Sequence, residues 1–183
     1  MPVSKNFALP DTLIEYCEHS SIALTVADAM REDQPLVLAN DTFLRLVGYG
    51  ADEVLERNCR FLQGPDTGED ERAKVSAFIH DDTIEAQRFR IVNHRKDGTS
   101  FDNFLFMSRL RDELGETRLF LGAQFDLTKA QRRSTVVHYN DDLEKNVSDI
   151  NAVSKGFGMA MIDSAGVISR SISMLATMAF RQS

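Results

Sequence analysis

The segment AQRFRIVNHRKDGTSFDNFLFMSRL, residues 86–110, alternates apolar and polar side chains on both sides of the pair Asp97-Gly98. Alternation with a period of two is typical of β-strands, and Asp-Gly is a preferred hairpin turn. A third run of this kind, TRLFLGAQFDL at 117–127, follows Gly115. The sequence therefore predicts three long antiparallel strands at 86–95, 99–110 and 117–127.

The residues before this segment predict two short strands and a set of helices. IALTVAD (22–28) and PLVLAN (35–40) are rich in residues that favour strands. Capping residues and helical spacing of apolar side chains predict helices at 11–19, 41–47, 51–55, 58–63 and 69–79. Two groups of strands separated by helices indicate an α+β fold in which the helices cover a sheet face.

The composition of the 183 residues suits a globular protein, since 43% are apolar and 27% are charged. The net charge of −7 argues against nucleic acid as the main partner, because phosphate binding requires a basic surface. Cys17 and Cys59 have no metal-ligating neighbours in sequence, so they fit a reducing compartment and predict no metal site. Because neither a signal peptide nor a membrane span is recognised, we expect a cytoplasmic protein without a membrane partner.

One side-chain amide lies on the mostly apolar, inward face of each long predicted strand. These amides are Asn93, Asn103 and Gln124, and Leu105 and Phe120 share the same faces. Burying an amide without a partner costs about 1–3 kcal/mol, so either water or a ligand with a polar edge should satisfy them. The pyrimidine edge of a flavin fits, because it offers a donor between two acceptors. The alternative is a register shifted by one, which places the amides on the solvated face.

The stretch NCRFLQG, residues 58–64, contains one thiol beside one cation. A lone Cys in a short helix is commonly a small core residue. Taken together with the three amides, however, this stretch resembles the cysteine-helix signature of LOV (light, oxygen, voltage) domains, a flavin-binding branch of the PAS family. The resemblance covers roughly residues 20–128. It implies the PAS/LOV fold: a five-stranded antiparallel sheet with helices on one face, plus an N-terminal helix (1–19) and a C-terminal helical hairpin (129–183).

The resemblance also implies a mechanism that is a switch rather than enzymatic turnover. A flavin lies between the sheet and the Cys59 helix, and blue light leads the Cys59 sulfur to add reversibly to ring carbon C4a. Protonation of N5 then reorients the Gln124 amide and alters contacts of the C-terminal helices. The implied cofactor-binding residues are Asn58, Arg60, Gln63, Asn93, Asn103, Leu105, Phe120 and Gln124, with Arg60 directed at the cofactor phosphate.

Two positions depart from the family pattern. Glu56 stands where most members have Gly, so the turn before Asn58 is expected to be built differently. Ser76 stands where most members supply a second Arg for the phosphate. Arg72 and Lys74 lie nearby, and either they point inward or they belong to an exposed helix face. FMN is the expected cofactor, while riboflavin and FAD remain open alternatives.

The segment 129–183 predicts two amphipathic helices. Val136, Leu143 and Ile150 repeat at seven residues, and a second apolar stripe runs through 161–179. We expect these helices to form a light-sensitive homodimer that signals to an unidentified downstream protein. His138, which precedes acidic residues, offers the weaker alternative of a phosphoacceptor site.

Two other functions stay open at this point. The pocket could serve a flavin redox sensor or an interaction module without photochemistry, which would show no reversible bleaching under blue light. A flavin enzyme is disfavoured, because no general base or nicotinamide fingerprint accompanies the site. Steady oxidation of added reduced nicotinamide in darkness would support it.

Overall fold

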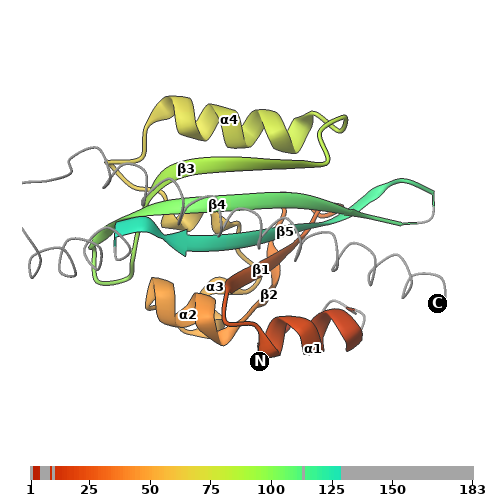
Figure 1. Ribbon diagram of the computed structural model, residues 1–183, viewed down its shortest axis with the longest axis horizontal. Helices are drawn as coiled ribbons and strands as arrows, with labels where there is room; N and C mark the ends of the chain where they lie inside the picture. Colours follow the sequence, from red (N-terminus) through yellow and green to blue (C-terminus); the bar gives the residue numbers. More distant parts are fainter. Residues whose placement is uncertain (1, 5–8, 10, 113, 129–183) are drawn as a thin grey trace, which may run out of the picture.

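The computed structural model describes residues 2–4, 9, 11–112 and 114–128, drawn in colour in Figure 1. The predicted C-terminal helices and their dimer contacts, together with His138, lie outside the described residues. Within these ranges no helix is long and apolar enough to cross a membrane. The same ranges contain no cluster of three His, Cys, Asp or Glu side chains able to hold a metal ion.

Five antiparallel strands form a single sheet in the order β2-β1-β5-β4-β3. They are β1 (Ala23–Asp28), β2 (Leu36–Ala39), β3 (Ala86–His94), β4 (Ser100–Arg111) and β5 (Thr117–Asp126). All five predicted strands are thereby confirmed. β5 is the last strand in the chain but the central one in the sheet, because it pairs with β1 on one side and β4 on the other.

The two predicted hairpin turns are also confirmed, and each uses a glycine in the left-handed region. Gly98, between β3 and β4, has φ +83°, and Gly115, between β4 and β5, has φ +80°. The Asp97 carboxylate accepts a hydrogen bond from the backbone N–H of Thr99 (2.9 Å), which tightens the first turn.

Four short helices connect β2 to β3, and one helix precedes β1. The connecting helices are α2 (Asp41–Val47), α3 (Ala51–Val54), the 3₁₀ helix η1 (Cys59–Leu62) and α4 (Glu69–His80), and α1 spans Asp11–His19. Asn40 caps α2, since its Oδ1 accepts from the N–H groups of Phe43 (2.9 Å) and Leu24 (3.0 Å). The helix predicted at 58–63 is present as η1, a 3₁₀ helix of four residues.

The helices divide between the two faces of the sheet. Phe43, Leu62 and Phe78, from α2, η1 and α4, pack on the face that carries Phe101 and Phe120. On the opposite face, α1 contributes Leu13 and Cys17 to a second core against β1, β4 and β5. Figure 1 shows α4 alongside β3, with α1 and α2 at the β1–β2 end.

This arrangement fixes the register of the sheet. The three amides Asn93, Asn103 and Gln124 are 5%, 1% and 4% exposed, so the alternative that places them on a solvated face is wrong. They lie on the helix-covered face, as period two predicted. Cys17 is fully buried under the other face and acts as a packing residue.

Candidate functional site

Cys59 begins η1 and turns toward the protein interior. The helix starts there because Asn58 Oδ1 accepts from the Arg60 N–H (2.9 Å), and it ends where Gln63 N–H donates to Arg60 O (2.8 Å). Cys59 is half-buried and packs against the cluster that contains Leu62. Burial raises the pKa of the Cys59 thiol to about 12. The sulfur therefore carries its proton at neutral pH.

A chain of amide hydrogen bonds links the sheet to η1. Asn103 Nδ2 donates to Asn93 Oδ1 (2.9 Å), and Asn93 Nδ2 donates to the carbonyls of Leu62 (3.4 Å) and Val92 (3.3 Å). Leu62 is the last residue of η1. Two of the predicted site residues are thus in direct contact, and one of them contacts the backbone of the cysteine helix.

The third amide has a partner that sequence reasoning missed. Gln124 Nε2 donates to Thr25 Oγ1 (3.0 Å) on the neighbouring strand β1. Thr25 is 4% exposed and lies on the same face as Gln124. Period two within 22–28 places Thr25 on the inward face with Ala23 and Ala27. The sequence pattern could therefore have identified Thr25 as a residue of this face.

Two amide oxygens on this face have no hydrogen-bond partner. They are Asn103 Oδ1 on β4 and Gln124 Oε1 on β5, and both are buried. Leu105, which pairs with Gln124 across the sheet, is half-buried and packs in one cluster with Phe120. Each of these two oxygens needs a hydrogen-bond donor, because a buried acceptor without one lowers the stability of the fold by about 1–3 kcal/mol.

Gly122 makes room for the Gln124–Thr25 contact. A Cβ at this position would lie 2.8 Å from Thr25 Oγ1 and 2.9 Å from Gln124 Nε2. Both distances are shorter than carbon makes to such atoms, so any larger residue would push the amide or the hydroxyl aside. The absence of a side chain here is therefore a requirement of the site.

Arg60 and Asn58 both contact the loop between β1 and β2. Arg60 Nη1 lies 2.5 Å from the Asp33 carboxylate, and the two side chains are 59% and 53% exposed. Asn58 Nδ2 donates to the backbone carbonyl of Asp33. Gln63 is half-buried directly after η1. The structure thus places Arg60 at the surface, and both Arg60 and Asn58 contact the acidic loop residue Asp33.

The two departures from the family pattern have physical explanations. Glu56 has φ +62°, a conformation that favours glycine and costs other residues about 1–2 kcal/mol. Its carboxylate pairs with Arg31 (2.6 Å) and accepts from the Ser4 hydroxyl, and these bonds lower the pKa of Glu56. Glu56 thus has a backbone conformation that glycine adopts readily, and its carboxylate is held by Arg31 and Ser4.

Ser76 and its neighbours on α4 differ in where they point. Ser76 and Lys74 are exposed. Arg72 reaches back along the chain, where its Nη2 donates to the carbonyls of Gly64 (2.9 Å) and Thr67 (2.8 Å). Of the two cations considered for the phosphate, Arg72 is the one that contacts the loop directly after η1.

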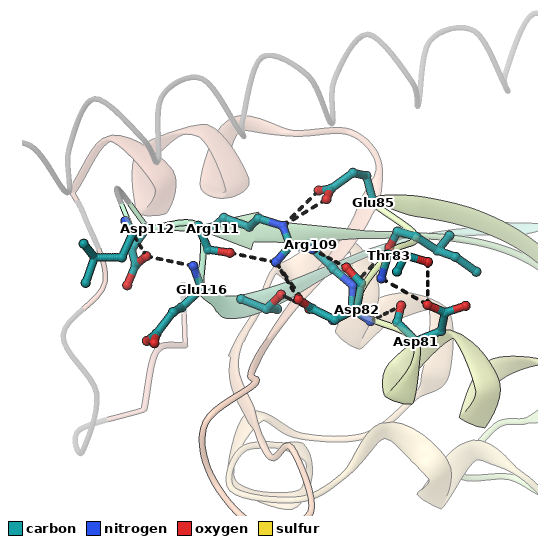
Figure 2. Close-up of polar contacts among 12 residues, drawn as sticks. Asp81, Asp82, Thr83, Glu85, Arg109, Arg111, Asp112 and Glu116 are labelled. Atoms are coloured by element: carbon teal, nitrogen blue, oxygen red, sulfur yellow. Dashed lines mark hydrogen bonds and ion pairs between the residues drawn. The ribbon is translucent and has the colours of Figure 1, made fainter.

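A buried arginine, Arg109 on β4, adjoins the site and was not predicted. Its Nη2 donates to the carbonyls of Phe78 (2.5 Å), Ile79 (3.2 Å) and Asp81 (3.0 Å), where α4 ends. Its guanidinium lies 5.0 Å from the ring centres of Phe78 and Phe120. Figure 2 shows Arg109 and Arg111 reaching from β4 to the acidic segment 81–85. Arg109 therefore joins the end of α4 to a predicted site residue.

A comparison with protein families agrees with this geometry. The model for the PAS domain matches residues 23–129, which contain the whole sheet and η1. The chain belongs to the PAS family. The matched range begins at the first residue of β1 and ends just beyond β5, so α1 and the segment after 129 lie outside the PAS match.

Relatives place this PAS domain in the LOV branch. A blue-light-activated histidine kinase of Rhizobium johnstonii is 40% identical over 115 residues, which are 63% of this chain and 33% of that protein. A blue-light photoreceptor of Listeria monocytogenes is 33% identical over 144 residues, 79% of this chain and 53% of that protein. The chain thus spans about half or less of these two relatives.

A solved structure gives the same answer for the fold. The LOV domain of the Erythrobacter litoralis EL346 blue-light activated histidine kinase is 37% identical, with a TM-score of 0.55. The match covers 58% of this chain and 95% of that domain. The predicted PAS/LOV fold, a five-stranded antiparallel sheet with helices, is confirmed.

Proposed function

We propose that this chain is a blue-light receptor whose LOV domain, residues 20–128, binds a flavin between η1 and the sheet. One observation carries the proposal. Two buried amide oxygens without partners, Asn103 Oδ1 and Gln124 Oε1, lie on the sheet face that η1 covers with a neutral thiol. A planar, largely apolar ligand with a hydrogen-bond donor on its edge would complete such a site.

The residues of the site fit a flavin. Its pyrimidine edge carries an N–H between two carbonyls, so it can donate to an amide oxygen and accept from an amide N–H. Asn103 offers the orphan oxygen, and Asn93 can exchange its bond to Leu62 for one to the ligand. Leu105 and Phe120 supply apolar contact surface for the rings. FMN is the cofactor that the LOV branch implies.

A flavin held between η1 and the sheet would supply a light-excited ring, and Cys59 would add its sulfur there reversibly and give up its proton to the ring. Cys59 contributes the electron pair of the new S–C bond as its S–H bond breaks. Since burial keeps the thiol protonated at neutral pH, this proton is available at the moment of reaction. No prior thiolate is needed, and Arg60, which pairs with Asp33, is not required to activate the sulfur.

Gln124 is the residue that we propose transmits the change. Its amide can present either oxygen or N–H to the ligand by rotating. Its partner Thr25 permits both orientations, because a hydroxyl can accept from Nε2 or donate to Oε1. Rotation therefore costs no buried hydrogen bond on the β1 side. The consequence falls on β5, whose end leads into residues 129–183.

An absorbance spectrum tests the proposal. Purified full-length protein should show a flavin band in the blue that bleaches under blue light and recovers in darkness. Absence of any bound flavin would refute the proposal. A flavin band that does not bleach would favour the alternative of a redox sensor or an interaction module without photochemistry.

Gln124→Leu should preserve bleaching but reduce the structural response. Leucine fills a similar space but cannot exchange a donor for an acceptor beside the ligand. The measurement is the light-minus-dark difference in helix signal by circular dichroism, which we expect to fall at least threefold. Thr25→Val is the matched variant, because it removes the partner hydroxyl while Gln124 stays. An undiminished response in Gln124→Leu would mean that the signal leaves the flavin by another route.

Arg60→Ala should weaken binding of FMN more than binding of riboflavin, because only FMN carries the phosphate. A charge-assisted hydrogen bond contributes about 1.5–3 kcal/mol, which corresponds to roughly tenfold or more in affinity. Dissociation constants measured by quenching of flavin fluorescence provide the comparison. Equal losses for the two flavins would show that Arg60 supports the fold instead.

We further propose that residues 129–183 make a homodimer whose geometry or stability changes in light. Moving such an equilibrium tenfold takes about 1.4 kcal/mol, comparable to one or two hydrogen bonds. A truncated chain ending at Thr128 should then still bleach but run as a monomer in light and dark. The downstream protein in this scheme reads the change in the dimer.

A further inference from the structure

Resting on the proposed flavin site, we propose that Asp33 determines the preference of the site between flavins with and without a phosphate. Its carboxylate holds the guanidinium of Arg60, so a phosphate must compete with it for the same cation. Asp33 should consequently lower the preference of the site for FMN over riboflavin.

Asp33 is fixed at the start of η1 by two separate contacts. Its backbone carbonyl accepts from Asn58 Nδ2, and its carboxylate lies 2.5 Å from Arg60 Nη1. Asp33 and Gln34 have φ values of +65° and +42°, which turn the loop back toward β2. Gln34 N–H closes this turn by donating to Arg31 O (3.1 Å). The carboxylate is therefore presented to Arg60 by a defined loop conformation.

The other arginines around η1 are engaged differently. Arg57 Nη1 donates to Glu53 O (2.9 Å), and its guanidinium lies 4.8 Å from the centre of the Phe61 ring. Arg72 bonds carbonyls of the loop after η1. Arg60 differs from both in that its partner is a carboxylate, which competes with a phosphate directly. It is also the residue that the family pattern assigns to the phosphate.

The acidic character of the surrounding segment works in the same direction. The nine residues that follow Gln63 contain four carboxylates, Asp66, Glu69, Asp70 and Glu71, and one cation, Arg72. A dianionic phosphate brought to this region meets their repulsion, whereas the uncharged end of riboflavin does not. Asp33 adds to that repulsion and also pairs with Arg60.

The expected magnitude follows from the exposure of the pair. Both side chains are more than half exposed, and such pairs change an equilibrium by roughly 1.4- to 5-fold. Removing a like charge close to the phosphate adds a further effect of similar size. We therefore expect Asp33→Asn to tighten FMN binding by about three- to tenfold and to change riboflavin binding less than about twofold.

Asparagine is the suitable replacement at this position. It tolerates positive φ better than other side chains of its size, and it retains the carbonyl that Asn58 contacts. Asp66→Asn is the matched control. It removes one negative charge from the loop after η1, but Asp66 contacts His94 (3.2 Å) and not Arg60.

The experiment measures dissociation constants of FMN and riboflavin for full-length wild type, Asp33→Asn, Asp66→Asn, Arg60→Ala and the double variant Asp33→Asn/Arg60→Ala, by quenching of flavin fluorescence at low salt. The proposal requires a selective gain in FMN affinity for Asp33→Asn that disappears in the Arg60→Ala background. An unchanged FMN-to-riboflavin ratio, or an equal gain in Asp66→Asn, overturns it while leaving the flavin site intact. If neither flavin binds the wild type, the proposed function itself fails.

Discussion

Replacing Cys59 by alanine should abolish reversible bleaching and leave a yellow, flavin-bound protein. We expect the loss to be complete, because in the proposed reaction the sulfur is a reactant and not a modifier of the rate. The second thiol cannot substitute. Cys17 lies in α1 under the opposite face of the sheet, is fully buried, and has its pKa raised to about 12 by that burial.

Absorbance of the blue flavin band before illumination, after illumination and after dark recovery measures this result. Cys17→Ala is the control, and it should bleach like the wild type. Wild-type bleaching in Cys59→Ala would refute the assignment of Cys59. Loss of flavin from the Cys59→Ala protein would instead indicate that the thiol is needed for packing in η1, which Cys59→Ser would separate from reactivity.

Replacing Arg109 by methionine should destabilise the domain by about 3 kcal/mol or more. The substitution removes this donor from the carbonyls of Phe78 and Ile79, and a buried orphan costs about 1–3 kcal/mol, whereas Asp81 O still accepts from the Ile84 N–H (3.3 Å). It also removes the cation from between the Phe78 and Phe120 rings, although methionine restores much of the packing. The free energy of unfolding in urea measures the effect.

Arg111→Met is the matched control for this loss. Arg111 also lies on β4, but its carboxylate partners Asp82 and Glu85 are 68% and 66% exposed, and such ion pairs contribute about 0–1 kcal/mol. Its bonds to the carbonyls of Asp82 (2.6 Å) and Gly115 (2.8 Å) are exposed as well. Figure 2 shows both arginines meeting the same segment. Equal destabilisation in the two variants would mean that the burial of Arg109 and its carbonyl partners adds nothing to the exposed contacts of Arg111.

The strands could be predicted from sequence because their signals are local. Alternation with period two and the glycines at 98 and 115 predict the strands and turns without reference to the rest of the chain. The same alternation placed Asn93, Asn103 and Gln124 on one face. No periodicity relates Cys59 to these three amides, because they lie far apart along the chain. Only the resemblance to LOV domains predicted that Cys59 and the amides belong to one site.

The contacts that sequence reasoning missed all join distant segments. Asp33 and Arg60 meet because the β1–β2 loop folds over the start of η1, which no periodicity describes. Arg109 is a charged residue in a strand, a position usually exposed, and only the end of α4 makes its burial favourable. Glu56 shows the same limit, since the sequence identified an unusual residue but not the backbone conformation that it adopts.

The position of β5 has a consequence for how the protein is made. The strands β1 and β2 can pair as soon as they are synthesised, and so can β3 and β4, but only β5 joins the two pairs. Such long-range pairing is slow, because the chain loses conformational entropy when distant segments come together, before the new contacts offset that loss. During synthesis, the β1–β2 pair and the β3–β4 pair therefore each keep an unpaired strand edge until residues 117–126 have left the ribosome. The proposed flavin site combines Asn93 and Asn103 from one half with Gln124 from the closing strand, so we expect it to be complete only after this step.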